Sequence, residues 1–329
     1  MRAYELHAYE GPSGLRLADR PLPEPDAESA LVDAHAIGVN FPDLLITQGL
    51  YQLKPDLPFV PGCEVAGVVR SAPDGSGFAV GARVGAFIWQ GGYAQTAPVP
   101  LSHLVRLPDA MSFEAAAALL VNHHTVHFAL ARRGRLEADE TVLVLGAAGG
   151  IGTAAVQVAK GLGATVLGGV MAGPAAESQR AVALDAGADD VVLLEEGFAR
   201  QVKERTGGRG VDVVLDPLGD WLFVEATRAL APEGRILVVG FAAGDIPTIR
   251  VNRLLLNNIA AVGVAWGASL ARDAALLGEG SRALHAMFAE GTVRPQIGRR
   301  FAFEELPEAL AALQAGQIRG KGVVTVPQP

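Results

Sequence analysis

A glycine-rich segment between an apolar run and a helical pattern is the feature that most constrains the fold. The run Thr141–Leu145 leads into Gly146-Ala147-Ala148-Gly149-Gly150-Ile151-Gly152, and the apolar positions that follow recur at helical spacing. In a strand–turn–helix unit, small residues let a pyrophosphate approach the backbone, and the helix N-terminus supplies free N–H groups. The alternative is a tight turn that needs glycine only for its conformation. We favour a dinucleotide site with cofactor contacts at Ala148, Gly149, Gly150 and Ile151.

Apolar runs alternate with helical patterns from residue 119 to residue 262. The runs are Thr141–Leu145, Thr165–Val170, Asp190–Leu194, Val211–Leu215, Arg235–Val239 and Ile259–Val264. Runs this apolar suit a parallel sheet covered on both faces, and the alternation predicts a doubly wound α/β sheet. The chain is β-rich before residue 119. After residue 263 we expect helices at Asp273–Glu290 and Glu304–Ala315, and a strand at Gly322–Val326.

Composition excludes several classes of protein. The 329 residues are half apolar, which is enough for two domains with sizeable cores. The net charge of −8 argues against a nucleic-acid binder and leaves no basic face for a membrane. Cys63 is the only cysteine, so neither an internal disulfide nor a multi-thiolate metal site is possible. Because we find no leader and no uninterrupted apolar span, we expect a cytoplasmic protein.

The end of the second apolar run bears on which cofactor is used. Folds that prefer NAD usually place Asp or Glu there, to bind the ribose 2′-hydroxyl. Here no acid follows Thr165–Val170 until Glu177, so nothing repels a 2′-phosphate. Arg180 is the candidate partner for that phosphate, although it could equally be a solvated helix residue. We therefore expect NADPH as the cofactor, with NADH less favoured.

Several separate stretches resemble the zinc-independent quinone oxidoreductases of the medium-chain dehydrogenase/reductase superfamily. Their order and spacing cover nearly the whole chain. Besides the glycine-rich segment, the stretches are Gly38–Asp43, Gly49–Tyr51, Pro58–Gly67, Gly81–Val84, Gly187–Asp189 and Gly320–Val324.

The resemblance implies a GroES-like catalytic domain built from both chain ends, with a Rossmann domain inserted between them. The sequence pattern also changes near residue 119, where alternating runs begin, and near residue 263, where they end. Together with these changes, the resemblance divides the chain into residues 1–118 plus 263–329 and residues 119–262. It also implies a homodimer. The apolar segment Ile259–Leu270 supports that expectation, since it extends past the last strand and could pair with a second copy.

The resemblance also bears on metal binding. Zinc-dependent relatives hold a catalytic metal through Cys, His and Cys, and here the first two positions are Asn40 and Cys63. The segment expected to give the third ligand, Arg83–Val99, holds neither Cys nor His. A catalytic zinc site needs three protein ligands, so we expect no metal.

Without zinc to polarise an oxygen, the chemistry should favour acceptors that are already electrophilic, such as quinones and enones. The protein then has to stabilise a developing oxyanion, for which polar donors suffice. From the resemblance, Asn40 and Tyr51 are the candidate donors, and Asp43 orients one of them or relays a proton. The alternatives are a turn residue for Asn40, a helix cap for Asp43 and a packing aromatic for Tyr51.

The resemblance implies further cofactor contacts at Thr125, Gly240, Phe241, Val264 and Lys321. Of these, Gly240 and Phe241 end the fifth strand, at the edge where open sheets bind ligands. The group His123, His124 and His127 resembles a metal cluster by spacing alone. No carboxylate follows in the H-E-x-x-H manner, so we expect ordinary helix residues.

Three functions compete. The leading hypothesis is an NADPH-dependent quinone reductase, and the second is a 2-alkenal or enoyl reductase on the same scaffold. The third is a nucleotide-binding protein with a structural role. The polar trio Asn40, Asp43 and Tyr51 weighs against the third.

Overall fold

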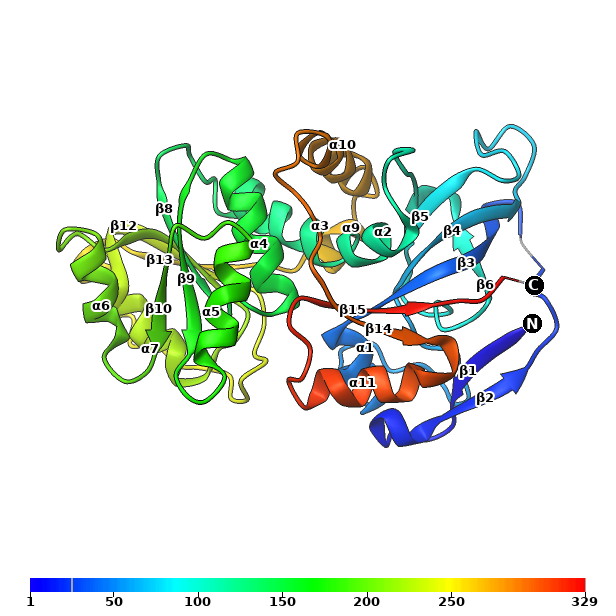
Figure 1. Ribbon diagram of the computed structural model, residues 1–329, viewed down its shortest axis with the longest axis horizontal. Coiled ribbons are helices and arrows are strands. Elements are labelled where there is room, and N and C mark those ends of the chain that lie inside the picture. The colour runs from blue at the N-terminus through cyan, green and yellow to red at the C-terminus, as the bar shows by residue number, and fades with distance from the viewer. Residues whose placement is uncertain (25, 329) are drawn as a thin grey trace. The chain divides into compact units, whose positions relative to one another are not determined.

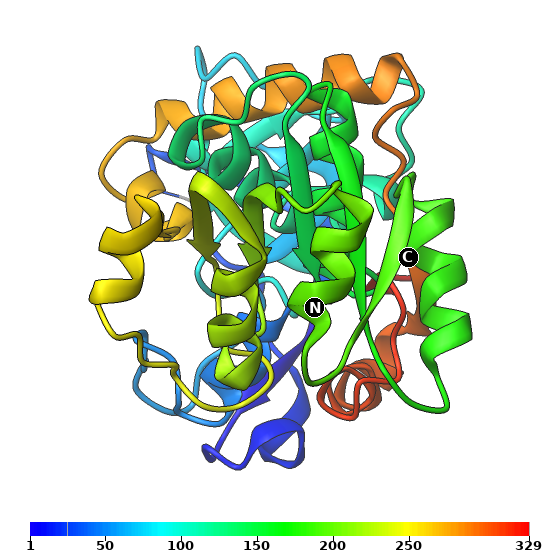
Figure 2. The same cartoon turned by 90° about the vertical axis from the view of Figure 1, so that its left-hand side faces the viewer.

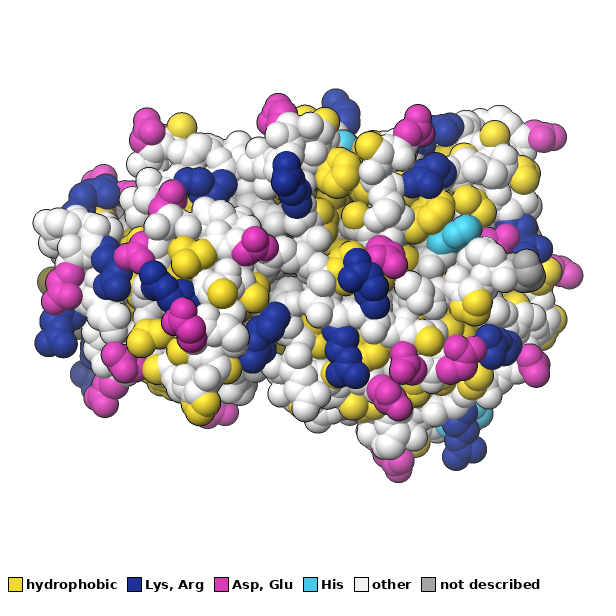
Figure 3. Space-filling view, in the orientation of Figure 1, with side chains coloured by type: hydrophobic (Ala, Val, Ile, Leu, Met, Phe, Trp, Pro, Cys, Tyr) yellow, Lys and Arg dark blue, Asp and Glu magenta, His cyan; other side chains and the backbone are white. Residues whose placement is uncertain are grey.

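The computed structural model describes residues 1–24 and 26–328. It divides the chain into two compact units. The central unit is Asn122–Gln296, and the terminal unit joins Met1–Val121 to the segment that starts at Ile297. No helix in the described part of the chain is long and apolar enough to cross a bilayer. Figure 3 shows acidic and basic side chains interspersed over one face, without an extended region of one sign.

The second boundary between the units differs from the sequence-based division at 262/263. Residues 263–296 belong to the central unit, because their helix packs on helices of that unit. Ser281 bonds to His124 with 2.9 Å between Oγ and Nε2. The backbone of Arg294 is held by the side chain of Gln157 through both its N–H and its carbonyl oxygen. These contacts join polar side chains that are distant in sequence, so the apolar pattern of the sequence could not predict them.

The central unit contains a six-stranded parallel sheet in the order β10-β9-β8-β11-β12-β13. This is the strand order of a Rossmann sheet, with the order reversing between β8 and β11, so the predicted doubly wound fold is confirmed. The strands are β8 (Thr141–Leu145), β9 (Thr165–Met171), β10 (Asp190–Leu194), β11 (Val211–Asp216), β12 (Leu230–Val238) and β13 (Ala260–Gly263).

Helices cover both faces of this sheet, which is why its middle strands are apolar on both sides. Figure 1 shows α4 and α5 on one side and α6 and α7 on the other, and the helices within each pair contact each other. The unit's helices are α3 (Asn122–His127), the π-helix η3 (Phe128–Arg133), α4 (Gly150–Gly161), α5 (Ala176–Asp185), α6 (Phe198–Arg205), α7 (Asp220–Ala229), α8 (Asn252–Asn257), α9 (Trp266–Leu270) and α10 (Ala275–Ala289).

The terminal unit contains a seven-stranded sheet in the order β14-β15-β3-β4-β5-β7, with β6 also paired to β3, and a separate β1–β2 pair. Its strands are β1 (Arg2–Leu6), β2 (Leu15–Asp19), β3 (Ser29–Val39), β4 (Glu64–Ser71), β5 (Arg83–Phe87), β6 (Thr96–Pro100), β7 (Leu104–Arg106), β14 (Ile297–Ala302) and β15 (Lys321–Thr325). Its helices are η1 (Gly11–Gly14), α1 (Phe41–Thr47), η2 (Leu101–His103), α2 (Phe113–Leu119), η4 (Phe303–Glu305) and α11 (Leu306–Gln314).

Strand β3 is the element that organises the terminal unit's polar residues. It pairs antiparallel with β15 on one side and with β4 on the other. The β15 register sets Gly322 against Val39, which brings Lys321 beside the end of β3. The β4 register sets Val65 against Ile37 and brings Glu64 to the same end. Three segments distant in sequence therefore meet where β3 gives way to α1.

Candidate functional site

The glycine-rich loop joins β8 to α4 at the carboxyl edge of the central sheet. Gly146 adopts a φ of 65°, and α4 begins at Gly150 with Gly149 as its N-cap. A Cβ at Gly152 would lie 2.0 Å from the carbonyl oxygen of Gly146, so that glycine is required for the close packing of the turn. A Cβ at Gly149 would meet only the same oxygen at 3.4 Å, which is ordinary contact. The open space at Gly149, beside the N-terminus of α4, fits a pyrophosphate.

Other predicted cofactor contacts end strands at this same edge. Gly240 and Phe241 follow β12, and the Phe241 side chain is partly exposed. Val264 follows β13, and its N–H donates to the carbonyl oxygen of Val238 at 3.0 Å. Thr125 lies on α3, which packs against α4. Because parallel strands end together, the residues after β12 and β13 lie along the carboxyl edge that carries the glycine-rich loop.

The side chain of Arg180 lies against β10 in the structure. Its Nη2 is 3.8 Å from Oδ1 of Asp190, and its Nη1 donates to the carbonyl oxygen of Val191 at 3.4 Å. Both partners are in the amino-terminal half of β10, three or more residues before the carboxyl edge at Leu194. The position of Arg180 in the structure therefore gives no support to a phosphate contact. Its contacts with Asp190 and Val191 are long, and its side chain is exposed enough to exchange them.

Asp216 is a residue at this edge that sequence reasoning missed. It ends β11 and is fully buried, with Oδ1 accepting the N–H groups of Leu218 at 2.8 Å and Gly219 at 2.9 Å. Its Oδ2 makes no hydrogen bond to the described residues. Burial raises the pKa of this carboxyl, while the two backbone N–H groups lower it. The sequence did carry a signal for this residue: an acid stands at the end of an apolar strand, just before the turn Pro217-Leu218-Gly219.

In the terminal unit, Asn40, Glu64 and Lys321 form one buried network. The Lys321 ammonium lies 2.6 Å from Oε2 of Glu64 and donates to Oδ1 of Asn40. Nδ2 of Asn40 donates to Glu64 at 3.0 Å and to the carbonyl oxygen of Gly38 at 3.2 Å. The second Glu64 oxygen accepts the N–H of Val121 at 2.8 Å. Each of the three side chains is at least 96% buried, so the charges are compensated within the protein.

This network changes the role that Asn40 can play. Both N–H groups of its amide already have acceptors, and its oxygen already accepts from Lys321. Asn40 therefore positions the ammonium group of Lys321, and it has no free donor for an oxyanion. Glu64 was missed as a functional residue, although a charged residue in the apolar run Cys63-Glu64-Val65-Ala66 is unusual. A Cβ at Gly38 would lie 2.2 Å from Oε2 of Glu64, so only glycine fits there.

Asp43, Cys63 and Tyr93 form a second buried group beside this network. Asp43 accepts the N–H of Asn40 at 3.0 Å through Oδ2, as the third helical residue of a capping box whose N-cap is Asn40. Its Oδ1 and the hydroxyl of Tyr93 make no hydrogen bond of ordinary geometry to described residues. Burial raises the pKa of Asp43 to about 6, although the nearby Cys63 thiol, Lys321 ammonium and Tyr93 hydroxyl each lower it. The cap of α1 is therefore Asn40, and Asp43 supports it from the third helical position as a carboxyl with a pKa of about 6.

Tyr51 is half-buried and close enough to sense this group. Burial, the Cys63 thiol and the Asp43 carboxylate all raise the pKa of its hydroxyl. The hydroxyl therefore stays protonated at neutral pH and can donate a hydrogen bond. Burial and the Asp43 carboxylate also raise the pKa of Cys63 well above its ordinary value, so its sulfur is an unreactive thiol.

Two histidines of α3, His123 and His124, take part in internal hydrogen bonds. His123 contacts Gln157 with 3.2 Å between Nε2 and Oε1, and His124 bonds to Ser281. Burial lowers the pKa of His127, which favours its neutral form. Among the residues that the structure describes, no three His, Cys, Asp or Glu side chains lie close enough together to hold a metal ion.

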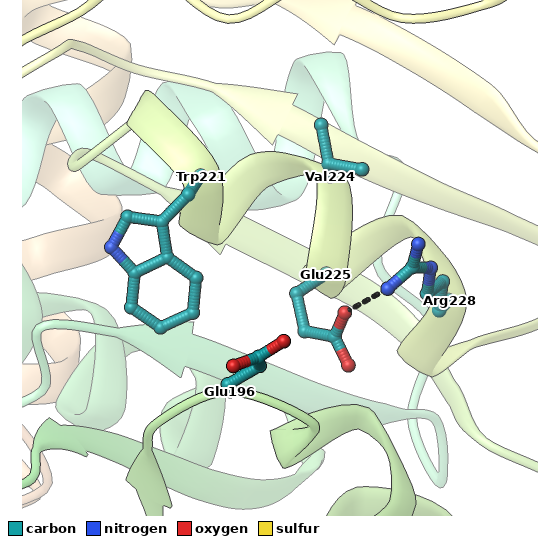
Figure 4. A pocket seen from close by; sticks show the side chains of 5 residues that line it. All are labelled: Glu196, Trp221, Val224, Glu225 and Arg228. Carbon is teal, nitrogen blue, oxygen red and sulfur yellow. Dashed lines mark hydrogen bonds and ion pairs between the residues drawn. The ribbon is translucent and has the colours of Figure 1, made fainter.

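A hollow of about 530 Å³ on the central unit contains none of the predicted site residues. Figure 4 shows that four of its five lining residues come from α7, with Glu196 completing it from the turn after β10. Glu225 and Arg228 pair with each other at 2.5 Å across one side of it. The hollow offers no glycine-rich backbone, so it is not suited to a dinucleotide.

Comparison with known proteins identifies the family. A family model described as a zinc-binding dehydrogenase matches residues 150–277, and one described as an alcohol dehydrogenase GroES-like domain matches residues 26–109. The quinone oxidoreductase-like protein 2 of Bos taurus is 35% identical over 90% of this chain and 84% of its own length.

Solved structures agree with that assignment. A probable oxidoreductase from Mycobacterium abscessus is 46% identical, with a TM-score of 0.90 over 99% of this chain and 98% of its own. The quinone oxidoreductase from Thermus thermophilus, solved also as its complex with NADPH, is 35% identical, with a TM-score of 0.85 over 99% of this chain and 100% of its own. The chain therefore belongs to the quinone oxidoreductase-like family of oxidoreductases within the medium-chain dehydrogenase/reductase superfamily.

Proposed function

We propose that this protein reduces quinones with NADPH by direct hydride transfer and without a metal. The observation that carries the proposal is the pairing of two features in one chain. The central unit has a glycine-rich loop with room for a pyrophosphate at Gly149, and the terminal unit has a buried polar group around Asp43 and Lys321. The Thermus thermophilus relative, solved with NADPH, supports the choice of cofactor.

The loop residues Ala148, Gly149, Gly150 and Ile151 would hold the pyrophosphate, with Thr125, Gly240, Phe241 and Val264 as further contacts. When bound, NADPH supplies a hydride from C4 of its nicotinamide to the conjugated acceptor. Tyr51 donates a hydrogen bond to the oxyanion that develops on the acceptor. Its protonated state at neutral pH supports this role.

The buried network of Asn40, Glu64 and Lys321 fixes the polar groups of the terminal unit's site. Glu64 and Asn40 hold the ammonium group of Lys321 in place, which leaves one of its three N–H bonds for a further acceptor. The pKa of Asp43 is about 6, and its carboxylate raises the pKa of the Tyr51 hydroxyl. Asp43 can therefore take part in returning a proton to Tyr51 after Tyr51 has protonated the acceptor. We therefore propose Tyr51 as the donor, Asp43 as the proton relay and Asn40 as a positioning residue.

A homodimer is also proposed, through the edge of the central sheet. Among the described strands, β13 pairs only with β12, and Ala260, Ala261 and Gly263 on it are exposed. Figure 2 shows α8, in yellow, at the outer margin of the central unit, and Val251, Leu255 and Leu256 on or beside it are each 75% exposed. An unpaired edge strand and exposed apolar side chains are the features that a second copy would cover.

We expect sedimentation velocity at micromolar concentration to give the mass of a dimer. A charged residue on the free edge should weaken assembly, so Ala261→Lys is expected to shift the population towards monomer. A monomer mass for the wild-type protein would contradict the proposal.

Tyr51→Phe should slow turnover without abolishing it. Loss of one oxyanion donor costs up to roughly 10²–10³-fold where that stabilisation dominates. We expect a smaller loss with a quinone than with an enal, whose enolate intermediate is the stronger base. Steady-state rates with both acceptor classes, using 4-deuterated NADPH to report hydride transfer, provide the measurement.

The control for this variant is Tyr4→Phe, which removes a hydrogen bond to the carbonyl oxygen of Glu304 in the core of the same unit. It should leave turnover unchanged. Equal rates for wild type and Tyr51→Phe with both acceptors would remove Tyr51 from the reaction. No turnover of any quinone or enal by the wild type would defeat the proposed function itself.

Arg180→Ala should weaken NADPH binding by roughly ten-fold or more and leave NADH binding nearly unchanged, because a charged hydrogen bond would be lost. This requires the 2′-phosphate to displace Asp190 from Arg180. Fluorescence titration of both cofactors is the measurement, with Arg200→Ala on the exposed face of α6 as the control. An equal effect on both cofactors would place the phosphate contact elsewhere.

Asp43→Asn should change how stability depends on pH. A carboxyl whose pKa is about 6 in the folded chain, against an ordinary 3.8, holds its proton more tightly when folded. Its contribution to stability is therefore present at pH 4 and is lost as the pH rises through 6. Relative to wild type, Asp43→Asn should gain about 2.5 kcal/mol between pH 4 and pH 7 in urea unfolding. A pH-independent difference between the two proteins would show that Asp43 does not titrate in this range.

A further inference from the structure

A second hollow lies at the opposite end of the central sheet from the glycine-rich loop. Its volume is about 500 Å³, and it is lined by Arg132–Arg135, Glu137, Glu140, Arg235, Ala260 and Val262. The segment Gly134–Glu140 leads into β8, whose far end carries the glycine-rich loop. Five residues of extended strand separate the two by about 16 Å. The hollow is therefore independent of the proposed cofactor contacts.

One ion pair forms the wall of this hollow. Arg235 contacts both oxygens of Glu140 at 2.6 Å, through Nη1 and Nη2. It also donates to the carbonyl oxygens of Gly134 at 2.6 Å and Arg135 at 3.0 Å. These four bonds use most of the N–H donors of the Arg235 guanidinium. The ion pair also neutralises the charge of Glu140. Arg235 and Glu140 therefore fix the shape of the hollow without contributing net charge.

The remaining charge in the hollow is positive. Arg132, Arg133 and Arg135 form no ion pair with any residue in the described part of the chain, and Glu137 is the one lining acid not paired to an arginine there. Nε of Arg133 donates to the carbonyl oxygen of Gly263 at 3.0 Å, which orients the side chain and leaves its Nη groups available. The Arg132 guanidinium is 5.9 Å from the centroid of the Phe128 ring. Three arginines against the single acid Glu137 leave a formal charge of about +2 (3 − 1) around the hollow, in a chain whose net charge is −8.

The backbone that presents these arginines is also unusual. Phe128–Arg133 is a π-helix, a conformation that is rare and frequently found at functional sites. Arg135 and Asp139 adopt φ values of 48° and 70°, which residues other than glycine seldom do. Such conformations persist where the surrounding structure holds them, and they cluster at ligand sites.

We propose that this hollow binds a phosphate-class anion through the guanidinium groups of Arg132, Arg133 and Arg135. Guanidinium groups match the geometry of phosphate oxygens and form paired, charge-assisted hydrogen bonds with them. Three of them exceed the charge of a single carboxylate but suit a phosphoryl dianion. The ligand is either inorganic phosphate or the phosphoryl group of a small metabolite.

The test is isothermal titration of inorganic phosphate into the full-length protein, at ionic strength held constant with chloride. The variant Arg132→Gln/Arg133→Gln/Arg135→Gln should bind phosphate at least ten-fold more weakly than wild type. A charge-matched control, Arg16→Gln/Arg200→Gln/Arg282→Gln, alters exposed arginines elsewhere and should bind as wild type does. Gly149→Val, which blocks the glycine-rich loop, should retain this binding and lose that of NADPH.

Three results would overturn the proposal. These are unchanged phosphate binding in the first triple variant, an equal loss in the charge-matched control, and loss of all phosphate binding in Gly149→Val. Circular dichroism checks that the triple variant is folded, and the single variant Arg135→Gln, at an exposed position, replaces it if it is not. Titration with glycerol phosphate distinguishes the sources: tighter binding than inorganic phosphate indicates a metabolite, and weaker binding indicates the free ion.

Discussion

The buried ion pair between Lys321 and Glu64 is the interaction on which the terminal unit's polar site depends. Two charges removed from water lose several kcal/mol of solvation each, and only close pairing with further hydrogen bonds compensates for that loss. Here Asn40 and the Val121 N–H bond to the pair and compensate most of that loss, and one N–H of the Lys321 ammonium stays available. Removing either charged partner would leave the other buried alone, at a cost of about 3–5 kcal/mol.

The same network explains several features of its surroundings. Gly38 has no side chain because Oε2 of Glu64 occupies the space. Asp43 cannot easily ionise because the volume around it is filled by protein, and the nearby Lys321 ammonium is already paired with Glu64. Its pKa is therefore set by burial more than by attraction. The protonation state of the terminal unit's polar site therefore depends on Lys321, which pairs directly with Glu64 and lowers the pKa of Asp43 only in part.

The nucleotide-binding half of the fold could be predicted from the sequence because its signals are local. Two expected strands, Thr141–Leu145 and Asp190–Leu194, have the predicted bounds in the structure, and the strand–glycine–helix unit forms where its spacing indicated. Helix Asp273–Glu290 was expected and forms as Ala275–Ala289. In each case, the apolar period and the punctuating glycines act over a few residues, so no knowledge of tertiary contacts is needed.

The candidate site could be predicted only in its location, and the reason is that its contacts are long-range. Asn40, Asp43 and Lys321 do come together, but the sequence carried no sign that both N–H groups of Asn40 would be used internally. Arg180 was proposed from its distance along the chain to β9, whereas its side chain contacts β10. Tyr93 gave no signal in the sequence, because it reaches Asp43 only through the packing of its loop against Gly62, where a side chain would clash with the Tyr93 ring.

The order of these segments along the chain has a consequence for synthesis. The central unit is continuous, so it can fold as soon as it leaves the ribosome. The terminal unit cannot, because Lys321 follows Asn40 by 281 positions and β15 is what covers one edge of β3. Until then, the nascent protein carries an uncompensated Glu64 and an open strand edge, which is the kind of surface that chaperones bind and that misassembles when they are scarce.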